Sequence, residues 1–238
     1  MHIPDGLLIP INPTTHSLNF PDTAVLVGTW AITIPFLVYS WKKTKETQST
    51  SFASTLAILS ALVFVLQMLT FPVAGGTTVH ILGGTLVAII LGPYAAMLSM
   101  TMVLAMQAFF FADGGLMAFG ANALNMAVIS SLGFFFLKFL AGNSGNKKRF
   151  ASSVFAATFA SAVLTAVLTA LEIGVSQAFA SSGGIMVTLP AMLGVYAAEG
   201  LVEAALTSLV ATGLMISLPH FKNTALAGIR MLTEKKPV

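Results

Sequence analysis

The sequence predicts an all-α polytopic membrane protein with seven transmembrane helices. Of the 238 residues, 56% are hydrophobic and only 8% are charged, against about 25% charged in a typical soluble domain. The apolar residues form long runs separated by short polar stretches, and the basic residues gather in three clusters. A soluble fold of this size could not cover its surface with so few charges, so residues 1–238 are expected to form a single integral membrane domain.

Six apolar runs approach the length of a membrane-spanning helix, which needs about 20 residues to cross a hydrocarbon core of about 30 Å. They are, in order, 23–40, 52–71, 94–111, 121–141, 150–179 and 188–218. A shorter run, His80–Leu91, contains a pair of glycines and would rise only about 18 Å as a helix. It is either a short span extended backwards through Thr77 or a re-entrant segment buried in protein.

The positions of the basic residues decide between these alternatives. They are Lys42, Lys43, Lys45, Lys138, Lys147, Lys148, Arg149, Lys222, Arg230, Lys235 and Lys236. All of them lie on one side of the membrane only if His80–Leu91 crosses, and an excess of Lys and Arg marks the cytoplasmic side. The sequence therefore predicts seven spans, with the N-terminus outside and the C-terminus in the cytoplasm.

The same topology divides the chain into an outer segment (1–22), a helical bundle (23–218) and a basic cytoplasmic tail (219–238). The net charge of +3 is explained by this one-sided distribution, so no nucleic-acid partner is expected. Without cysteine, disulfides and thiolate metal sites are excluded. The first twenty residues lack a basic region and contain three prolines, so no cleavable signal peptide is expected.

The first two residues carry the clearest chemical signal. A bulky residue at position 2 generally blocks removal of the initiator methionine, so the chain is expected to begin with a free Met1 amine followed by His2. The amine, the deprotonated His2 amide and His2 Nδ1 can close two chelate rings in one plane. One further imidazole would complete a square of four nitrogens, the geometry that favours Ni(II), Cu(II) or low-spin Co(II) over Zn(II).

His80 is the natural fourth ligand, because the charge argument places it at the outer face together with His2. The alternative is that both histidines are ordinary polar residues at the membrane boundary. His16 is expected to be a solvated loop residue of the outer segment, with a transient metal contact as the alternative, and His220 lies on the cytoplasmic side, away from this site.

Four separated motifs resemble one known family. They are MHIPDG at 1–6, TTVHILGGTL at 77–86, LGPYAAMLSMTMVLAMQAFFFADGG at 91–115 and GANALNMAV at 120–128. In their order, and in the number of spans, they resemble the CbiM/NikM family, the substrate-binding components of energy-coupling-factor importers for cobalt and nickel. The resemblance implies that Met1, through its amine, His2, through its amide and imidazole nitrogens, and His80 hold Ni²⁺ or Co²⁺ as the bound substrate.

The resemblance also implies partners. These are a transmembrane coupling subunit, two ATP-binding cassette ATPase subunits and often a small accessory membrane subunit, all at the cell membrane of a prokaryote. The chain has no GxxxxGK[ST] motif of its own, so uphill transport would draw its energy from these partners. The metal is expected to be captured outside and released inside, and the chain is not expected to be an enzyme.

Four polar residues are candidates for supporting the metal ligands. Asp5 could orient the chelating terminus or balance its charge, although an Asp-Gly pair is also a common turn. Gln107, Asn122 and Asn125 lie near the outer ends of two spans, where they could hydrogen-bond His80 or the N-terminal segment, or could hold helices together. Asp113 is expected to be a loop or helix-cap residue.

Three glutamates lie within apolar runs, where ionisable residues are functional candidates. Glu199 and Glu203 share one helix face, and Glu172 lies on the preceding run; their role is left open. They support two alternatives, an autonomous proton-driven metal transporter and an intramembrane metalloenzyme. The enzyme is disfavoured because the chain has no HExxH motif and a closed square of nitrogens leaves no open position for water. The residues do not separate nickel from cobalt.

Overall fold

The computed structural model describes residues 1–46, 50–73, 77–142 and 146–217. Its elements are α1 (Phe20–Lys45), α2 (Thr50–Met68), β1 (Phe71–Val73), β2 (Thr77–Val79), α3 (Gly84–Leu91), α4 (Pro93–Phe111), α5 (Phe119–Asn122), the π-helix η1 (Ala123–Ile129), α6 (Gly133–Ala141), α7 (Lys147–Gly174), α8 (Gln177–Ala180) and α9 (Ile185–Ser217). The prediction of a helical protein is confirmed, with the addition of one short antiparallel hairpin of β1 and β2.

In the described part of the chain, five helical stretches are long and apolar enough to cross a membrane. They are Phe20–Lys45, Pro93–Phe111, Phe119–Ala141, Lys147–Gly174 and Ile185–Ser217. A shorter apolar helix covers Phe52–Met68. These lengths and compositions make the chain a multi-pass membrane protein.

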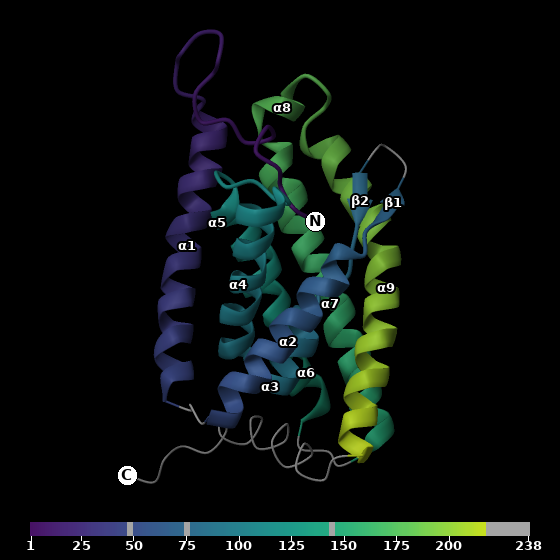
Figure 1. The fold of residues 1–238 in the computed structure, drawn as a ribbon. Helices are drawn as coiled ribbons and strands as arrows, with labels where there is room; N and C mark the ends of the chain where they lie inside the picture. Colours follow the sequence, from purple (N-terminus) through teal and green to yellow (C-terminus); the bar gives the residue numbers. More distant parts are fainter. Residues whose placement is uncertain (47–49, 74–76, 143–145, 218–238) are drawn as a thin grey trace, which may run out of the picture.

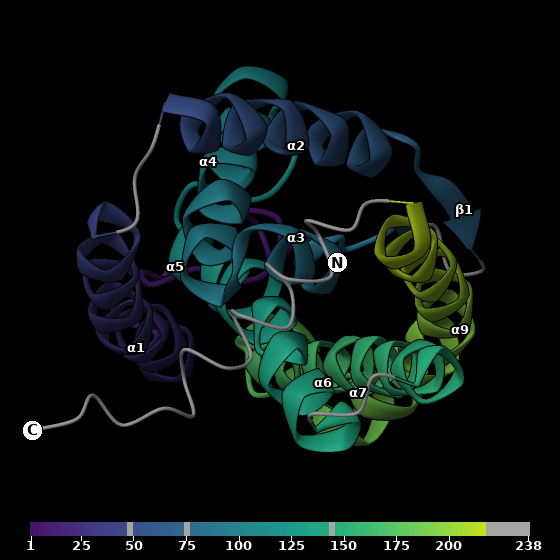
Figure 2. The same ribbon diagram turned by 90° about the horizontal axis from the view of Figure 1, so that it is seen from below.

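The elements run alternately between the two ends of the bundle (Figure 1). β2 lies near the end where the N-terminal segment enters, and α3 lies towards the opposite end, so the chain between them passes through the bundle. The helix in this passage begins only at Gly84, four residues later than the apolar run. Seen along the bundle, α3 lies in the interior, surrounded by longer helices (Figure 2).

The basic residues of the described chain are concentrated at the end of the bundle away from the N-terminus. Lys42, Lys43 and Lys45 lie in the last turn of α1, Lys138 lies in the last turn of α6, and α7 begins with Lys147, Lys148 and Arg149. Figure 1 shows these helix ends together at one end of the bundle. The four basic residues beyond position 218 lie outside the described residues.

The run 121–141 is broken rather than uniform. Between α5 and α6 the chain forms the wider winding of a π-helix, η1. Such segments are rare in proteins, and those that occur are often found at functional sites. Thr165 Oγ1, on α7, donates a hydrogen bond to the Asn125 carbonyl within it, at 3.3 Å. The same carbonyl also accepts the Ser130 N–H, and the Thr165 hydroxyl lies closer to the Ser161 carbonyl of its own helix, at 2.9 Å, so this contact with η1 is an additional one.

Small residues permit close helix packing around α3 and between α7 and α9. A Cβ on Gly84 would overlap Ser130, whose own Cβ would be 2.7 Å away, and a Cβ on Gly133 would come 3.0 Å from the Cβ of Thr85. A Cβ on Gly200 of α9 would lie 3.2 Å from Ala162 of α7. Such contacts are typical of helices that associate within a bilayer.

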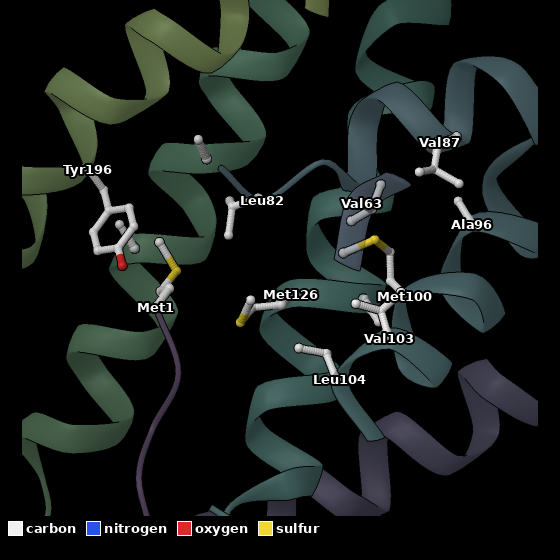
Figure 3. Packing of buried hydrophobic residues seen from close by; sticks show 14 of the residues in the cluster. Met1, Val63, Leu82, Val87, Ala96, Met100, Val103, Leu104, Met126 and Tyr196 are labelled. Carbon is white, nitrogen blue, oxygen red and sulfur yellow. The ribbon is translucent and has the colours of Figure 1, made fainter. Parts of the chain in front are cut away.

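The largest buried apolar cluster lies between these elements and includes Met1 at 5% exposure. The Met1 side chain lies beside Tyr196 of α9 and near Leu82, which precedes α3 (Figure 3). Met100 and Met126 belong to the same cluster. The first residue of the chain is therefore part of the core.

Candidate metal centre

The N-terminal segment is held in the bundle through the backbone of Ile3. The Ile3 N–H donates to Asn122 Oδ1 at 2.7 Å, and Asn122 Nδ2 donates to the Ile3 carbonyl at 3.0 Å. The same carbonyl accepts the Gly115 N–H at 2.8 Å. Ile3 itself is 1% exposed, so all of its backbone polar groups are paired where water cannot reach them.

A second attachment lies two residues further along. The Asp5 carboxylate accepts the Met117 N–H at 2.8 Å, and a Cβ on Gly115 would lie 2.7 Å from the Asp5 backbone nitrogen. The loop that follows α4 therefore fits closely against the segment. Asp5 fixes the segment to this loop rather than contacting Met1.

The Met1 amine lies against the ring of His80. Its nitrogen is 3.1 Å from His80 Nε2, while His80 Nδ1 lies 3.0 Å from the Ile81 carbonyl. A carbonyl only accepts, so Nδ1 carries the proton and the Nε2 lone pair faces the amine. Burial lowers the pKa of the Met1 amine from 8.0 to about 5. At neutral pH the amine is therefore uncharged and its lone pair is available to a metal ion.

The ring of His2 lies next to that of His80. The two ring centroids are 5.0 Å apart, with the planes at 67°. His2 Nδ1 donates to the Asp113 carbonyl at 3.2 Å and lies 3.6 Å from the Asp113 carboxylate. Burial, together with the neighbouring terminal charge, lowers the pKa of His2 to about 3, and burial raises the pKa of Asp113. His2 Nε2 is buried without a hydrogen-bond partner.

Gly114 makes room for the His2 ring. It adopts a φ of +89°, and a Cβ at this position would lie 2.6 Å from His2 Nδ1. Glycine is the residue that adopts this backbone conformation without strain. The FADGG motif thus combines a polar contact for His2 with the space that its ring occupies.

These groups match part of a planar nitrogen site. Metal–nitrogen bonds of about 2.0 Å place adjacent corners of a square about 2.8 Å apart, close to the 3.1 Å between the Met1 amine and His80 Nε2. Among the described residues, no group of three or more His, Asp or Glu side chains that could hold a metal ion is found. To complete the chelate, His2 has to exchange its Asp113 contact for the metal.

The remaining polar candidates lie in different networks. Asn122 binds Ile3, as described above, whereas Gln107 Nε2 donates to Gln67 at 2.9 Å rather than to a histidine. Asn125 Nδ2 bonds to Thr169 at 3.1 Å and to Glu172 at 2.5 Å, so it joins η1 to α7. His16 is exposed, and His220 lies outside the described residues.

Three residues near the site have contacts that the sequence did not predict. Asp113 faces His2, and Glu203 and Gln67 bind the turn that follows His80. Glu203 was recognisable as a carboxylate within an apolar helix, but its partner was not. Gln67 gave the weaker signal of a single amide near the end of an apolar run.

The chain resembles known transport proteins over most of its length. Residues 19–221 match the CbiM family model, described as the cobalt uptake substrate-specific transmembrane region. A candidate fused nickel transport protein, NikMN, of Archaeoglobus fulgidus is 34% identical over 219 residues, covering 92% of this chain and 67% of that protein. The cobalt transport protein CbiM of Lachnoclostridium phytofermentans is 32% identical over 203 residues, covering 83% of this chain and 79% of that protein.

The fold also has a solved counterpart. A truncated transition metal transporter superposes with a TM-score of 0.77 at 32% identity, covering 90% of this chain and 98% of the other. Two further fused relatives are matched over 36% and 34% of their own length, so this chain spans about a third of each. The relatives are named as transport proteins and not as enzymes. The resemblance predicted from the four motifs is confirmed: the chain belongs to the CbiM family of substrate-specific transmembrane regions.

Proposed function

We propose that this chain is the substrate-binding component of an ATP-driven importer of Ni²⁺ or Co²⁺. The Met1 amine, the His2 amide and imidazole nitrogens and His80 Nε2 hold the metal in a planar site. The observation that carries this proposal is the placement of the Met1 amine 3.1 Å from His80 Nε2, in a position where burial keeps the amine neutral. The names of the cobalt and nickel transport relatives support the choice of metals.

The proposal includes a direction of transport. With seven crossings, the N-terminal segment lies outside, and the C-terminal ends of α1 and α9 lie in the cytoplasm. The passage of residues 77–91 between the two ends of the bundle and the basic residues at the end away from Met1 support this topology. Metal is then captured outside, at the docked N-terminal segment, and released towards the cytoplasm.

Release requires a source of energy that we assign to partner proteins. A transmembrane coupling subunit and two ATPase subunits, with or without a small accessory membrane subunit, would move the loaded bundle in the bilayer of a prokaryotic cell membrane. An autonomous proton-driven transporter is the competing function, supported by Glu199, both of whose carboxylate oxygens are buried within an apolar helix. Reconstituted uptake by this chain alone, abolished by Glu199→Gln, would favour that function and contradict the partner-dependent one.

The decisive test of the metal site is to move the amine. Adding one alanine before Met1 displaces the chelating nitrogen while every side chain is retained. We expect tight Ni²⁺ and Co²⁺ binding, measured by isothermal titration calorimetry in detergent, to be lost in the extended protein and in His80→Ala. His16→Ala, which changes an exposed histidine, serves as the control and should bind normally. Tight binding by the extended protein would show that the site is not built on the N-terminus.

A further inference from the structure

The His80 side chain depends on a short turn for its orientation. His80 follows β2 and precedes α3 by four residues, and the intervening residues are neither strand nor helix. Within this turn, the orientation of the His80 ring is fixed by the hydrogen bond from its Nδ1 to the Ile81 carbonyl. Bonds from other elements must therefore keep the turn in one conformation.

Glu203 of α9 supplies two such bonds. Its Oε2 accepts the Leu82 N–H and its Oε1 accepts the Gly83 N–H, each at 2.9 Å. We call this pair of hydrogen bonds the Glu203 clamp. The carboxylate is 2% exposed and lies 120 residues beyond Gly83 in sequence, so it joins two distant parts of the chain.

The clamp lies at the start of α3. The N-cap residue, Gly83, offers no side chain to the first amides of the helix, and the glutamate binds the amides of Gly83 and of Leu82 immediately before them. Hydrogen bonds to a carboxylate are stronger than those between neutral groups, and an acidic group is favoured beside a helix N-terminus. The turn therefore has one strongly preferred position relative to α9.

The carbonyl side of the turn is held as well. Gln67 Nε2, on α2, donates to the Leu82 carbonyl at 2.7 Å, and Gln107 Nε2, on α4, donates to Gln67 Oε1 at 2.9 Å. Leu82 is thus bonded through its N–H to α9 and through its carbonyl to α2. Two helices therefore bond directly to the residue two positions after the proposed ligand, and a third, α4, holds the Gln67 side chain in place.

We propose that Glu203 is a positioning residue for metal capture, which keeps His80 Nε2 facing Met1 by clamping the Leu82 and Gly83 amides. Among the described residues, no hydrogen bond joins it to a proposed ligand atom, so its effect on His80 passes through the turn. The inference rests on the proposed function, since it assigns a role in the same site. Outer partners that orient a metal ligand change metal affinity by about 10- to 100-fold when they are mutated.

Glu203→Gln is the informative variant because it is nearly isosteric. Glutamine offers one accepting oxygen and one donating amide, so one of the two backbone N–H groups would face a donor. We expect Ni²⁺ affinity to fall about 10-fold or more, with a loss of the visible absorption band of the planar nitrogen complex. Helix content by circular dichroism should stay at the wild-type value.

Ser208→Ala is the matched control on the same helix. Ser208 also bonds from α9 to a backbone carbonyl, that of Ala151, at 2.8 Å, but this partner lies on α7 and not on the turn after His80. Its removal should leave Ni²⁺ affinity and the absorption band unchanged. A comparable loss in Ser208→Ala would mean that any weakening of α9 lowers affinity, which would overturn the positioning role.

A double-mutant cycle separates positioning from general stabilisation. If Glu203 acts through His80, then Glu203→Gln combined with His80→Ala binds no more weakly than His80→Ala alone, because the clamp then positions nothing. Additive losses, or wild-type affinity in Glu203→Gln, would overturn the inference. Tight binding that survives His80→Ala, or survives an added N-terminal residue, would instead contradict the proposed function itself.

Discussion

Asn122 binds Ile3 much as a neighbouring β-strand would, through one accepted and one donated hydrogen bond to the same residue. The amide side chain is 3% exposed, so neither bond is readily replaced by water. A buried backbone group left without a partner costs about 1–3 kcal/mol. The Asn122 side chain therefore makes a large contribution to the docking of the N-terminal segment.

Asn122→Ala should loosen the segment without unfolding the bundle. We expect faster hydrogen exchange at the Ile3 amide and weaker Ni²⁺ binding, because undocking competes with capture. Exchange monitored by mass spectrometry on the N-terminal peptide measures the first effect. Asn12→Ala, in which the lost side chain bonds only to Thr14 and Thr15 within the exposed loop, is the control. Unchanged exchange in Asn122→Ala would mean that other contacts hold the segment.

The residue scale also shows where sequence reasoning ends. Met1, His2 and His80 could be proposed as ligands from sequence because the chelating pattern depends on residues adjacent in sequence and on a motif. Asp113, Gln67 and Glu203 were not, because their partners are fixed by helix packing over long sequence separations. Periodicity and hydropathy indicate that a polar residue is buried in an apolar helix, but not which backbone group it meets.

At the scale of elements, α3 illustrates the limit of boundary prediction. The apolar run begins at His80, yet the helix begins at Gly84, because Glu203 binds the two preceding amides in a turn where Gly83 is left-handed. In the run 121–141, no change in composition signals the change of winding at η1. The two short strands Phe71–Val73 and Thr77–Val79 were not predicted. In each case the local sequence admits several conformations, and contacts with other elements select one.

The crossing of α3 with η1 and α6 depends on two glycines. Gly84→Ala would place a methyl group against Ser130, including its backbone carbon at 3.2 Å, so a rotamer change alone does not relieve the contact. Overpacking of this kind typically costs about 1–3 kcal/mol. We expect a lower midpoint of thermal unfolding in detergent for Gly84→Ala.

The matched control is Gly28→Ala on α1, where an added Cβ meets nothing within 4 Å. It should retain the wild-type midpoint or exceed it, since alanine favours the helix. Equal midpoints for Gly84→Ala and wild type would show that α3 can shift to admit the methyl group. That outcome would contradict the close packing described for this crossing.

At the scale of the whole molecule, the distribution of charge gave the most useful prediction. Hydropathy alone left His80–Leu91 ambiguous, and only the grouping of basic residues favoured a crossing there. Residues 77–91 pass from one end of the bundle to the other, and five helices of the described chain are long and apolar enough to cross a membrane by themselves, so the count of seven crossings stays a prediction. Charge was informative because it reflects the membrane, an environment that acts on every loop at once.

The orientation can be tested with single cysteines, since the natural chain has none. Ser17 and Lys147 are both exposed and belong to opposite ends of the bundle. We expect Ser17→Cys to react with a membrane-impermeant maleimide in intact cells, and Lys147→Cys to react only after the cells are opened. Labelling of both cysteines from the outside would contradict an odd number of crossings between positions 17 and 147.

Met1 belongs both to the largest apolar cluster and to the proposed ligand set. Metal binding at Met1 would therefore stabilise the folded core, and in this way affect the lifetime of the protein. A ligand that binds only the folded state adds to its free energy of unfolding, by about 2.7 kcal/mol at 100 times its dissociation constant. A receptor without cargo unfolds more readily and is degraded sooner. Metal supply would then regulate receptor abundance through turnover, without a separate sensor, and equal half-lives in metal-replete and chelator-treated cells would argue against it.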